Sequence, residues 1–473
     1  MRRVPMAAAA CVNRGEEVAL DIGRGLDRMV DRYLLICLFL AQFILTLTGV
    51  GNILVCALLG LLLCGAGLVQ DSAQVDLWVL LPLTVYNLFS MASSLRADGN
   101  ITEGYASIQT VLPVLYLLNA CLSGEERKLL RRMCVVWAGT AALGGIAQFL
   151  QRALTRGAQR LSGVLGGPNA MGIFLVVSWF LLVRCVSEAE GRQRDLLRRL
   201  EPVILAALAL TLSMGSFLAL AAGMLALLLA ERNGKPWSKV LLQACRMLAR
   251  ASLSMGTGIL VYLAASRTGR PWMALFPAGY ILALAALWPR VEGFLEQPRR
   301  AAVIAGMGIL VALAAVAVRP SAVATFLERL EMMENALGYL GREPLLGVGP
   351  YQWRLLNLYD EDKYFNTYHI HNAFLHVGVE LGLPAMAMLV LTAVRGFRKR
   401  GSAPRLGGCT AFLVHCLMDT GFLFIGLSSM ALAAAAEPEQ GGRRLPLVVQ
   451  RGFFALMGMQ FAYHLYFCIR YIG

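Results

Sequence analysis

The histidines of this sequence are concentrated where a polar segment meets an apolar one. The segment His369–Pro384 reads HIHNAFLHVGVELGLP, and four of the five histidines, His369, His371, His376 and His415, lie within it or shortly after it. A titratable imidazole is costly to keep in hydrocarbon, so this cluster predicts chemistry at the water boundary of a membrane. A neutral imidazole can take the proton of a hydroxyl group at neutral pH.

His371 and Asn372 stand at the start of a predicted helix, which carries Glu380 more than two turns further on. A carboxyl group in an apolar helix must be paired or protonated, so we expect Glu380 to contact a cation such as Arg329 or Arg160. The alternative for His371 is a histidine at a helix end that is hydrogen-bonded to backbone.

Two patterns could hold a metal: the histidines His369, His371 and His376, and a run of acidic residues. On a helix, His371 and His376 would point about 140° apart, unlike the histidine pair four residues apart that binds zinc on one helix face. The acidic stretch 360–362 has no recognised ligand spacing and is read as a solvated loop tip. We therefore expect no metal and no cofactor.

His415 and Asp419 are four residues apart and would share one face of a helix. They could form a proton relay or a buried hydrogen-bonded pair without a catalytic part. The structural pair is the favoured interpretation, because buried polar groups are usually hydrogen-bonded.

The elements that position these residues are membrane helices. The chain has 473 residues, of which 58% are hydrophobic and 15% charged. Such a composition is typical of a polytopic membrane protein, and no barrel pattern is present, so we predict an all-α transmembrane helix bundle. Residues 1–32 are predicted to be a cytoplasmic tail. Residues 33–473 are predicted to be a single transmembrane domain, into which an extracytoplasmic loop, 319–370, is inserted.

The net charge of +14 does not indicate nucleic-acid binding. The basic residues lie in short blocks between apolar segments, where they act as topology signals and contact anionic lipid. Counting crossings with these blocks on the cytoplasmic side gives about 12–15 spans. Segments 202–230 and 405–436 are too long for one crossing and are predicted to turn near Ser213–Ser216 and at Asp419–Gly421. A single kinked helix is the alternative for 202–230.

This count places four features on one extracytoplasmic face: the loop 151–167, the turn at Met214, the loop 319–370 and the turn at Asp419. Arginines at 152, 156 and 160 then lie outside, against the usual charge bias. A bound pyrophosphate would explain them, since guanidinium groups bind phosphate oxygens bidentately. Neutralisation of lipid headgroups explains them equally well.

The long loop is predicted to contain an amphipathic helix over 323–341 that lies on the membrane domain. Apolar residues recur there at three- and four-residue spacing, at Val323, Phe326, Leu327, Leu330, Met333, Leu337 and Leu340. Gly341 is a plausible C-cap, and Pro344 prevents continuation of the helix.

Five pieces of the sequence, in this order, resemble the O-antigen ligase and polymerase superfamily of polytopic glycosyltransferases. They are RLSGVLGGPNAMG (Arg160–Gly172), TLSMGSFLAL (Thr211–Leu220), ERLEMMENALGYLGREPLLGVGPYQW (Glu328–Trp353), HNAFLHVGVELGLP (His371–Pro384) and HCLMD (His415–Asp419). Each piece is short, but their order and spacing over just over half of the chain make the set specific.

The resemblance implies an integral protein of the plasma (inner) membrane that works on its extracytoplasmic face. It would transfer a glycan from an undecaprenyl-pyrophosphate carrier to a hydroxyl of a lipid, protein or glycan acceptor, without a metal. The expected site comprises catalytic His371 and Glu380, substrate-binding Arg160, Asn169, Arg329 and Asn372, and supporting His415 and Asp419.

The sequence departs from the family pattern at Met214, where an arginine usually follows the TLS segment. Either Arg160, Arg329 or Arg267 compensates for that cation, or this member handles its donor differently or is inactive. The sequence also leaves open whether the protein is a ligase or a polymerase of repeat units. A lipid or glycan transporter without covalent chemistry is the rival interpretation, with broken helices near Met214 and Asp419 as binding sites.

Overall fold

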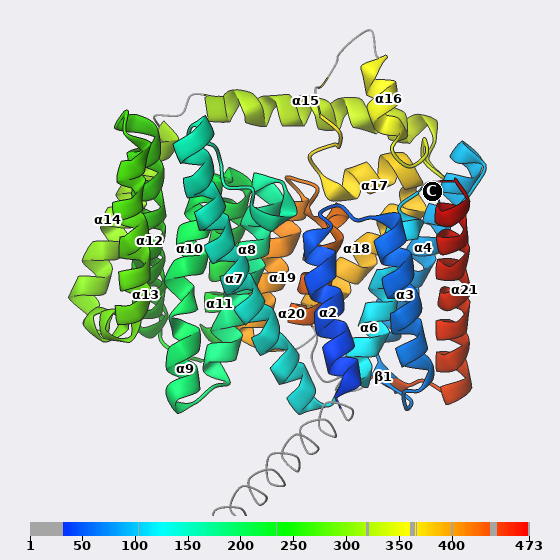
Figure 1. The fold of residues 1–473 in the computed structure, drawn as a ribbon, viewed down its shortest axis with the longest axis horizontal. Helices are drawn as coiled ribbons and strands as arrows, with labels where there is room; N and C mark the ends of the chain where they lie inside the picture. The colour runs from blue at the N-terminus through cyan, green and yellow to red at the C-terminus, as the bar shows by residue number, and fades with distance from the viewer. Residues whose placement is uncertain are drawn as a thin grey trace, which may run out of the picture.

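The computed structural model describes residues 32–471, apart from 103, 233, 318–320, 360–364, 366, 399–400 and 436–441. The predicted tail 1–32 lies, except for its last residue, outside the described residues, and so does the whole acidic stretch 360–362. The described chain is almost entirely helical (Figure 1). The prediction of an all-α membrane helix bundle is thereby confirmed.

Among the described residues, seven helical segments are long and apolar enough to cross a membrane. They are α4 (Leu77–Asp98), α7 (Gly124–Arg156), α8 (Pro168–Ser187), α11 (Met214–Arg232), α12 (Trp237–Arg267), η2 with α13 (Pro271–Leu295) and α21 (Leu447–Tyr471). Shorter apolar helices are α2 (Tyr33–Leu47), α3 (Ile53–Leu68), α5 (Ala106–Gln109) with α6 (Val111–Cys121), α18 (Leu383–Arg398) and α20 (Ile425–Ala435). The chain is a multi-pass membrane protein.

The remaining elements connect or cover these helices. They are α9 (Gly191–Arg198), α10 (Leu200–Thr211), α14 (Pro298–Ala317), α15 (Ser321–Arg342), α16 (Gln352–Leu358), α17 (Ala373–Leu381), α19 (Ala403–Cys416), η1 (Gly163–Leu165), η3 (Gly421–Leu423), β1 (Gln74–Val75) and β2 (Arg443–Arg444). The two strands form a short antiparallel pair.

Both long apolar segments are broken where the sequence predicted a turn. Leu212, with φ of 50°, ends α10 in a left-handed conformation that an L-residue rarely adopts, and α11 begins at Met214. The main partner changes at this break, because α10 packs chiefly against α12 and α8, whereas α11 packs chiefly against α19. The second break separates α19 from η3 and α20 and leaves Asp419 in the turn between them.

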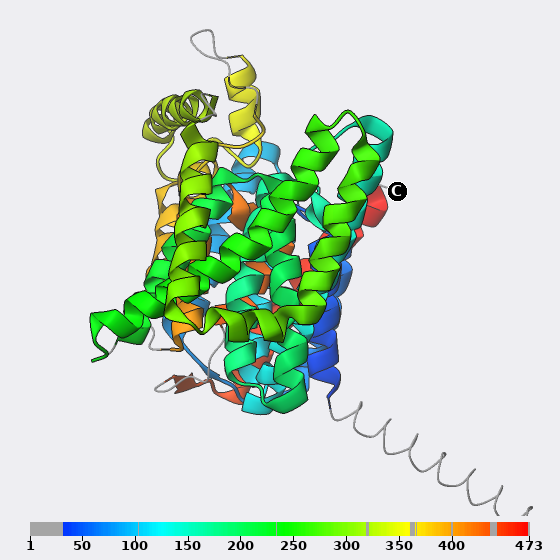
Figure 2. The ribbon, with the colours of Figure 1, turned by 90° about the vertical axis from the view of Figure 1, so that its left-hand side faces the viewer.

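The predicted amphipathic helix is α15, which lies across one end of the bundle, above α17 (Figures 1 and 2). The face of α15 that packs on the protein differs from the apolar stripe of the sequence. Phe326, Leu327, Leu330 and Leu337 are exposed, whereas Met332, Ala336, Tyr339 and Leu340 are buried. Because α15 lies on α17 along its C-terminal half only, the contact face is rotated away from the stripe of highest hydrophobicity.

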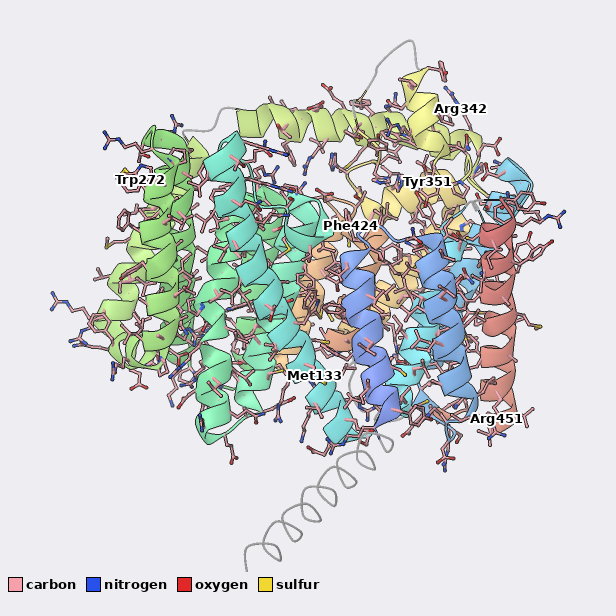
Figure 3. The ribbon with its side chains drawn as sticks, viewed as in Figure 1. Met133, Trp272, Arg342, Tyr351, Phe424 and Arg451 are labelled. Carbon is pink, nitrogen blue, oxygen red and sulfur yellow. The ribbon has the colours of Figure 1, made fainter. Side chains whose placement is uncertain are left out.

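The two ends of the bundle are distinguished in Figure 3, where Arg342 and Tyr351 lie at the end covered by α15, and Met133 and Arg451 lie toward the opposite end. The core between them is built around α8, which is the most enclosed of the candidate spans. Its Phe174, Trp179 and Phe180 are fully or almost fully buried. A rigid α8 fixes the position of Asn169, two residues from its N-terminal end at Gly167.

Candidate active site

Five segments that are far apart in the sequence meet at the α15 end of the bundle. They are the loop after α7, the N-terminus of α8, the break after α10, the middle of α15 and the turn after α19. A sixth segment, the one before α17, faces that turn with His371. The sequence predicts that the loop from 151, the turn at 214, the long loop and the turn at Asp419 converge, and the hydrogen bonds and ion pairs between them confirm that they come together.

Asp419 is the centre of this site. Its Oδ2 accepts a hydrogen bond from Asn169 Nδ2 (2.6 Å), and its Oδ1 accepts one from the backbone N–H of Thr420 (2.8 Å). The His371 Nδ1 lies 3.6 Å from Oδ1, and the Arg329 Nη2 lies 3.9 Å from Oδ2. Burial alone would raise the pKa of Asp419, but the facing imidazoles of His371 and His415 and the Thr420 N–H lower it below its ordinary value. Asp419 is therefore a carboxylate.

Arg160 is held in place by two hydrogen bonds. Its Nε donates to the Thr211 carbonyl oxygen (2.8 Å), which lies at the end of α10, and its Nη2 donates to Asn169 Oδ1 (2.7 Å). The Asn169 amide thus connects Arg160 to Asp419 and aligns the guanidinium with the carboxylate. Arg152 and Arg156, expected in a loop, instead lie in the last turns of α7, where Arg152 donates to Ser162 Oγ (2.9 Å).

Arg329 reaches the same site from α15. Its Nη1 donates to the Met418 carbonyl oxygen (2.9 Å), next to Asp419, and its side chain is 22% exposed. Its Nε is buried and has no hydrogen-bond partner among the described residues. A buried guanidinium N–H without a partner is a donor that an oxyanion would satisfy.

His371 projects from a segment that is fixed on both sides. The side chain of Asn372 accepts a hydrogen bond from the backbone N–H of Leu375 (3.0 Å) and so caps α17. Ile370, on the other side, is fully buried. The His371 side chain is 25% exposed and turns its Nδ1 toward Asp419, which leaves Nε2 as the proton acceptor.

Glu380 does not have the expected arginine partner, so that expectation is wrong. It is fully buried and accepts hydrogen bonds from the Tyr105 hydroxyl and from the backbone N–H groups of Tyr351 (2.9 Å) and Trp353 (3.2 Å). His376 Nε2 lies 3.5 Å from its Oε2. The physical reason is that neutral donors of the 347–353 loop and of Tyr105 enclose the carboxyl, while the arginines are directed to Asp419.

His415 also differs from the prediction. The helix α19 ends at Cys416, so Asp419 lies in the turn beyond it rather than on the same helix face. Neither ring nitrogen of the buried His415 has a hydrogen-bond partner among the described residues. The predicted hydrogen-bonded pair is therefore wrong, although His415 lies close enough to influence the charge on Asp419.

Sequence reasoning missed Tyr105 and the carbonyl of Thr211. A tyrosine between two short polar stretches carries no spacing that would connect it to a segment some 270 residues later, and a backbone carbonyl carries no residue-type signal at all. His376 was noted only as a metal ligand. In the part of the chain that the structure describes, no group of three His, Cys, Asp or Glu side chains is arranged to hold a metal ion.

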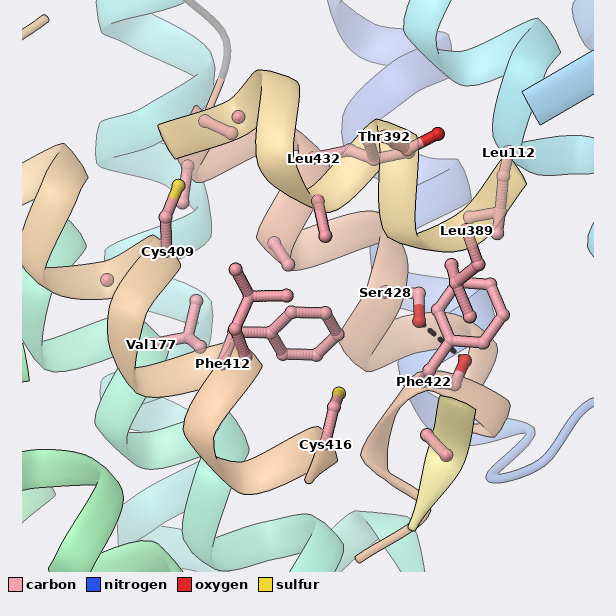
Figure 4. A pocket seen from close by; sticks show the side chains of 18 of the residues that line it. Leu112, Val177, Leu389, Thr392, Cys409, Phe412, Cys416, Phe422, Ser428 and Leu432 are labelled. Atoms are coloured by element: carbon pink, nitrogen blue, oxygen red, sulfur yellow. Dashed lines mark hydrogen bonds between the residues drawn. The ribbon is translucent and has the colours of Figure 1, made fainter. Parts of the chain in front are cut away.

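An apolar cavity of about 120 Å³ lies beside the site (Figure 4). Ala373, two residues after His371, and Cys416 and Phe422, on either side of Asp419, are part of its lining. Leu389, Phe412 and Leu432 line it deeper between α18, α19 and α20. None of its lining residues carries a charge, so the cavity is suited to a hydrocarbon group.

Chemically, the site combines an imidazole, a carboxylate that faces it, and guanidinium groups at the α15 end of the helix bundle. The imidazole can accept a proton, and guanidinium groups bind phosphate oxygens.

Comparison with known proteins agrees with this picture. Residues 251–390, from within α12 to within α18, match the family model described as O-antigen ligase. This stretch includes Arg329 and His371, whereas Arg160, Asn169 and Asp419 lie outside it. No curated protein is significantly similar to the chain. The resemblance read from the motifs is confirmed for residues 251–390 of this multi-pass membrane protein, which match the O-antigen ligase family model.

Proposed function

We propose that the protein is a membrane glycosyltransferase that moves a glycan from an undecaprenyl-pyrophosphate carrier to an acceptor hydroxyl at the outer face of the plasma membrane. The observation that carries this proposal is the meeting of Arg160, Asn169, Arg329 and His371 around the Asp419 carboxylate. A general base beside cationic groups is what a reaction with a hydroxyl nucleophile and a pyrophosphate leaving group requires.

In the proposed reaction, His371 Nε2 takes the proton of the acceptor hydroxyl. The hydroxyl oxygen forms a bond to the anomeric carbon of the donor, and the bond between that carbon and the pyrophosphate oxygen breaks. The electron pair of the broken bond leaves with the pyrophosphate, and attack from the opposite side inverts the anomeric centre. Asp419, 3.6 Å from His371 Nδ1, orients the ring and stabilises the imidazolium that forms.

The departing pyrophosphate gains negative charge, and we assign its stabilisation to Arg160 and Arg329. Arg329 offers its unpartnered Nε, and Arg160 is aligned by Asn169 and the Thr211 carbonyl. Fixed guanidinium groups need no reorganisation as this charge develops, and they can take the part that a magnesium ion plays in other phosphoryl and pyrophosphoryl reactions. Metal independence is therefore part of the proposal.

The missing family arginine at Met214 agrees with this assignment. Met214 begins α11 directly after the break that supplies the Thr211 carbonyl to Arg160, and its side chain is 40% exposed. Arg160 therefore brings a guanidinium to the region of the chain where the family carries one. We propose that Arg160 compensates for Met214, with Arg329 as the second cation.

The apolar cavity supports a lipid-linked donor. A polyprenyl tail is uncharged hydrocarbon, and a cavity whose lining reaches from Ala373 down to Leu432 would remove part of it from contact with the polar site. The cations and the hydrocarbon cavity lie next to each other, so they fit an amphiphile with an anionic head and an apolar tail. A free sugar nucleotide has no such tail and fits them less well.

The experiment is a transfer assay with purified protein in lipid nanodiscs, where both membrane faces are accessible and transport cannot mimic transfer. An undecaprenyl-pyrophosphate oligosaccharide is supplied with candidate lipid, protein and glycan acceptors, and the products are identified by mass spectrometry. The wild type should form a covalent glycan–acceptor product, and His371→Ala should form none while inserting and eluting normally. A wild type that forms no covalent product would favour the transporter, and normal product from His371→Ala would refute the assigned base.

A further inference from the structure

A second polar cluster, Tyr105–Glu380–His376–His369, lies behind the segment that carries His371. The Tyr105 hydroxyl donates to Glu380 Oε2 and lies 2.9 Å from His376 Nε2. The same His376 Nε2 lies 3.3 Å from His369 Nδ1. The groups therefore form a continuous chain from a fully buried carboxyl to a half-buried imidazole two residues before His371.

This cluster does not touch the cations of the site described above. Tyr105 and His376 are almost or fully buried, and Glu380 is enclosed by the Tyr351 and Trp353 backbone. A buried polar chain in a membrane protein is costly unless its members are satisfied, so its presence calls for a function. Since none of the three is exposed to a substrate, that function must be exerted through His369.

The donors and acceptors decide the direction of the hydrogen bonds. A tyrosine hydroxyl has one hydrogen, which Tyr105 gives to Glu380, so toward His376 it can only accept. His376 must then carry its proton on Nε2 and donate it. Burial lowers the pKa of His369 to about 4, so its ring is neutral at pH 7. His369 Nδ1, the other neighbour of that nitrogen, then shares the same His376 N–H as a second acceptor, which requires His369 to carry its own proton on Nε2.

The ionised carboxyl thus determines the tautomer of His376 and, through it, the orientation of His369. Burial raises the pKa of Glu380 to about 7, against the lowering effect of its three donors, so the carboxyl is ionised above about that pH. Protonation would reverse the Tyr105 hydroxyl, and His376 Nε2 would become an acceptor. The other titratable groups near this carboxyl are Tyr86 and Tyr351, on α4 and in the loop before α16.

The hydrogen-bonded chain affects His371 because its last member, His369, is only two residues away in the sequence. His369 is anchored by this chain, Ile370 by full burial and Asn372 by its cap on α17, so His371 is the residue of this segment left to face Asp419. A base misplaced by about 1 Å costs on the order of a hundredfold in rate. The direction of the His369 ring therefore bears on how well His371 is aimed.

We propose that Tyr105, Glu380, His376 and His369 form a positioning network that holds the His371 ring in its reactive orientation against Asp419. This inference rests on the proposed function, since it assumes that His371 is the base. It assigns Glu380 a role that acts through other residues rather than on the substrate.

The test is Tyr105→Phe, which deletes one buried oxygen and leaves the ring in place. In the nanodisc transfer assay its kcat should fall about 10- to 100-fold, the range for a lost hydrogen bond to a charged group, while the donor KM stays within about twofold. The matched control is Tyr116→Phe, which removes a half-buried hydroxyl that accepts a hydrogen bond from the Asp76 backbone N–H (3.1 Å), and it should keep wild-type kcat.

His369→Gln provides a second variant, at a half-buried position. It should lower kcat by a similar factor, and the double variant Tyr105→Phe with His369→Gln should lose little more than either single one, because both break the same chain. Wild-type kcat in folded Tyr105→Phe, or full additivity of the two changes, would overturn the inference. Loss of stability with unchanged kcat would show a structural role only, and a wild type without transferase activity would refute the proposed function instead.

Discussion

The carboxylate of Asp419 offers the sharpest test of the proposed site, through Asp419→Asn. The replacement keeps the shape of the side chain and removes its charge, 3.6 Å from His371 Nδ1. Opposite charges about 4 Å apart near a protein surface attract by about 4 kcal/mol at an effective dielectric constant of about 20. This attraction exists only once the imidazole is protonated, so it stabilises the transition state and not the ground state.

Losing about 4 kcal/mol would lower kcat by about a thousandfold, and partial exposure of His371 reduces this to between about a hundredfold and a thousandfold. The assay is steady-state transfer in nanodiscs with saturating donor. Asp419 also orients Asn169 and Arg329, but misplacement of those groups should appear in the donor KM, whereas the lost charge appears in kcat. The control is Asp98→Asn, which neutralises the carboxyl at the end of α4. A kcat for Asp419→Asn within threefold of the wild type would contradict the assigned pair.

Three further predictions follow from the same geometry. Arg329→Gln should raise the donor KM and lower kcat, so that kcat/KM falls at least about tenfold. Adding Met214→Arg should not restore the activity if Arg160 already supplies the other cation. Steady-state kinetics of both variants test this. Treatment with EDTA should change the transfer rate by less than about twofold. Loss of activity that only added Mg²⁺ restores would contradict the assignment of charge stabilisation to the arginines. Because burial raises the pKa of Glu380 from 4.5 to about 7, the folded state binds an extra proton between these values. This extra proton stabilises the folded state by about 3 kcal/mol, fully below pH 4.5, and the stabilisation is lost as the pH rises through 7. The melting temperature of the wild type should therefore fall more between pH 4.5 and 7 than that of Glu380→Gln.

The sequence by itself determined the class of the fold and the places where helices break. Composition and run length predict membrane helices because hydrocarbon leaves a buried backbone no other partner than its own helix. The turns near Ser213 and Asp419 were readable because charge bias and span length are local quantities that accumulate along the chain. The choice of His371 as the candidate base came from residue type and position in the sequence alone.

Only the tertiary structure decided which polar groups contact one another. Asn169 donates to Asp419 across 250 positions of sequence, and Tyr105 donates to Glu380 across 275. No periodicity encodes such pairs, because they depend on how whole helices pack and rotate. The same cause made the expected arginine partner of Glu380 wrong and turned the contact face of α15 toward Met332 and Ala336. Hydrophobic pattern shows that a helix has an apolar side, whereas the neighbours available along its length determine which side is buried.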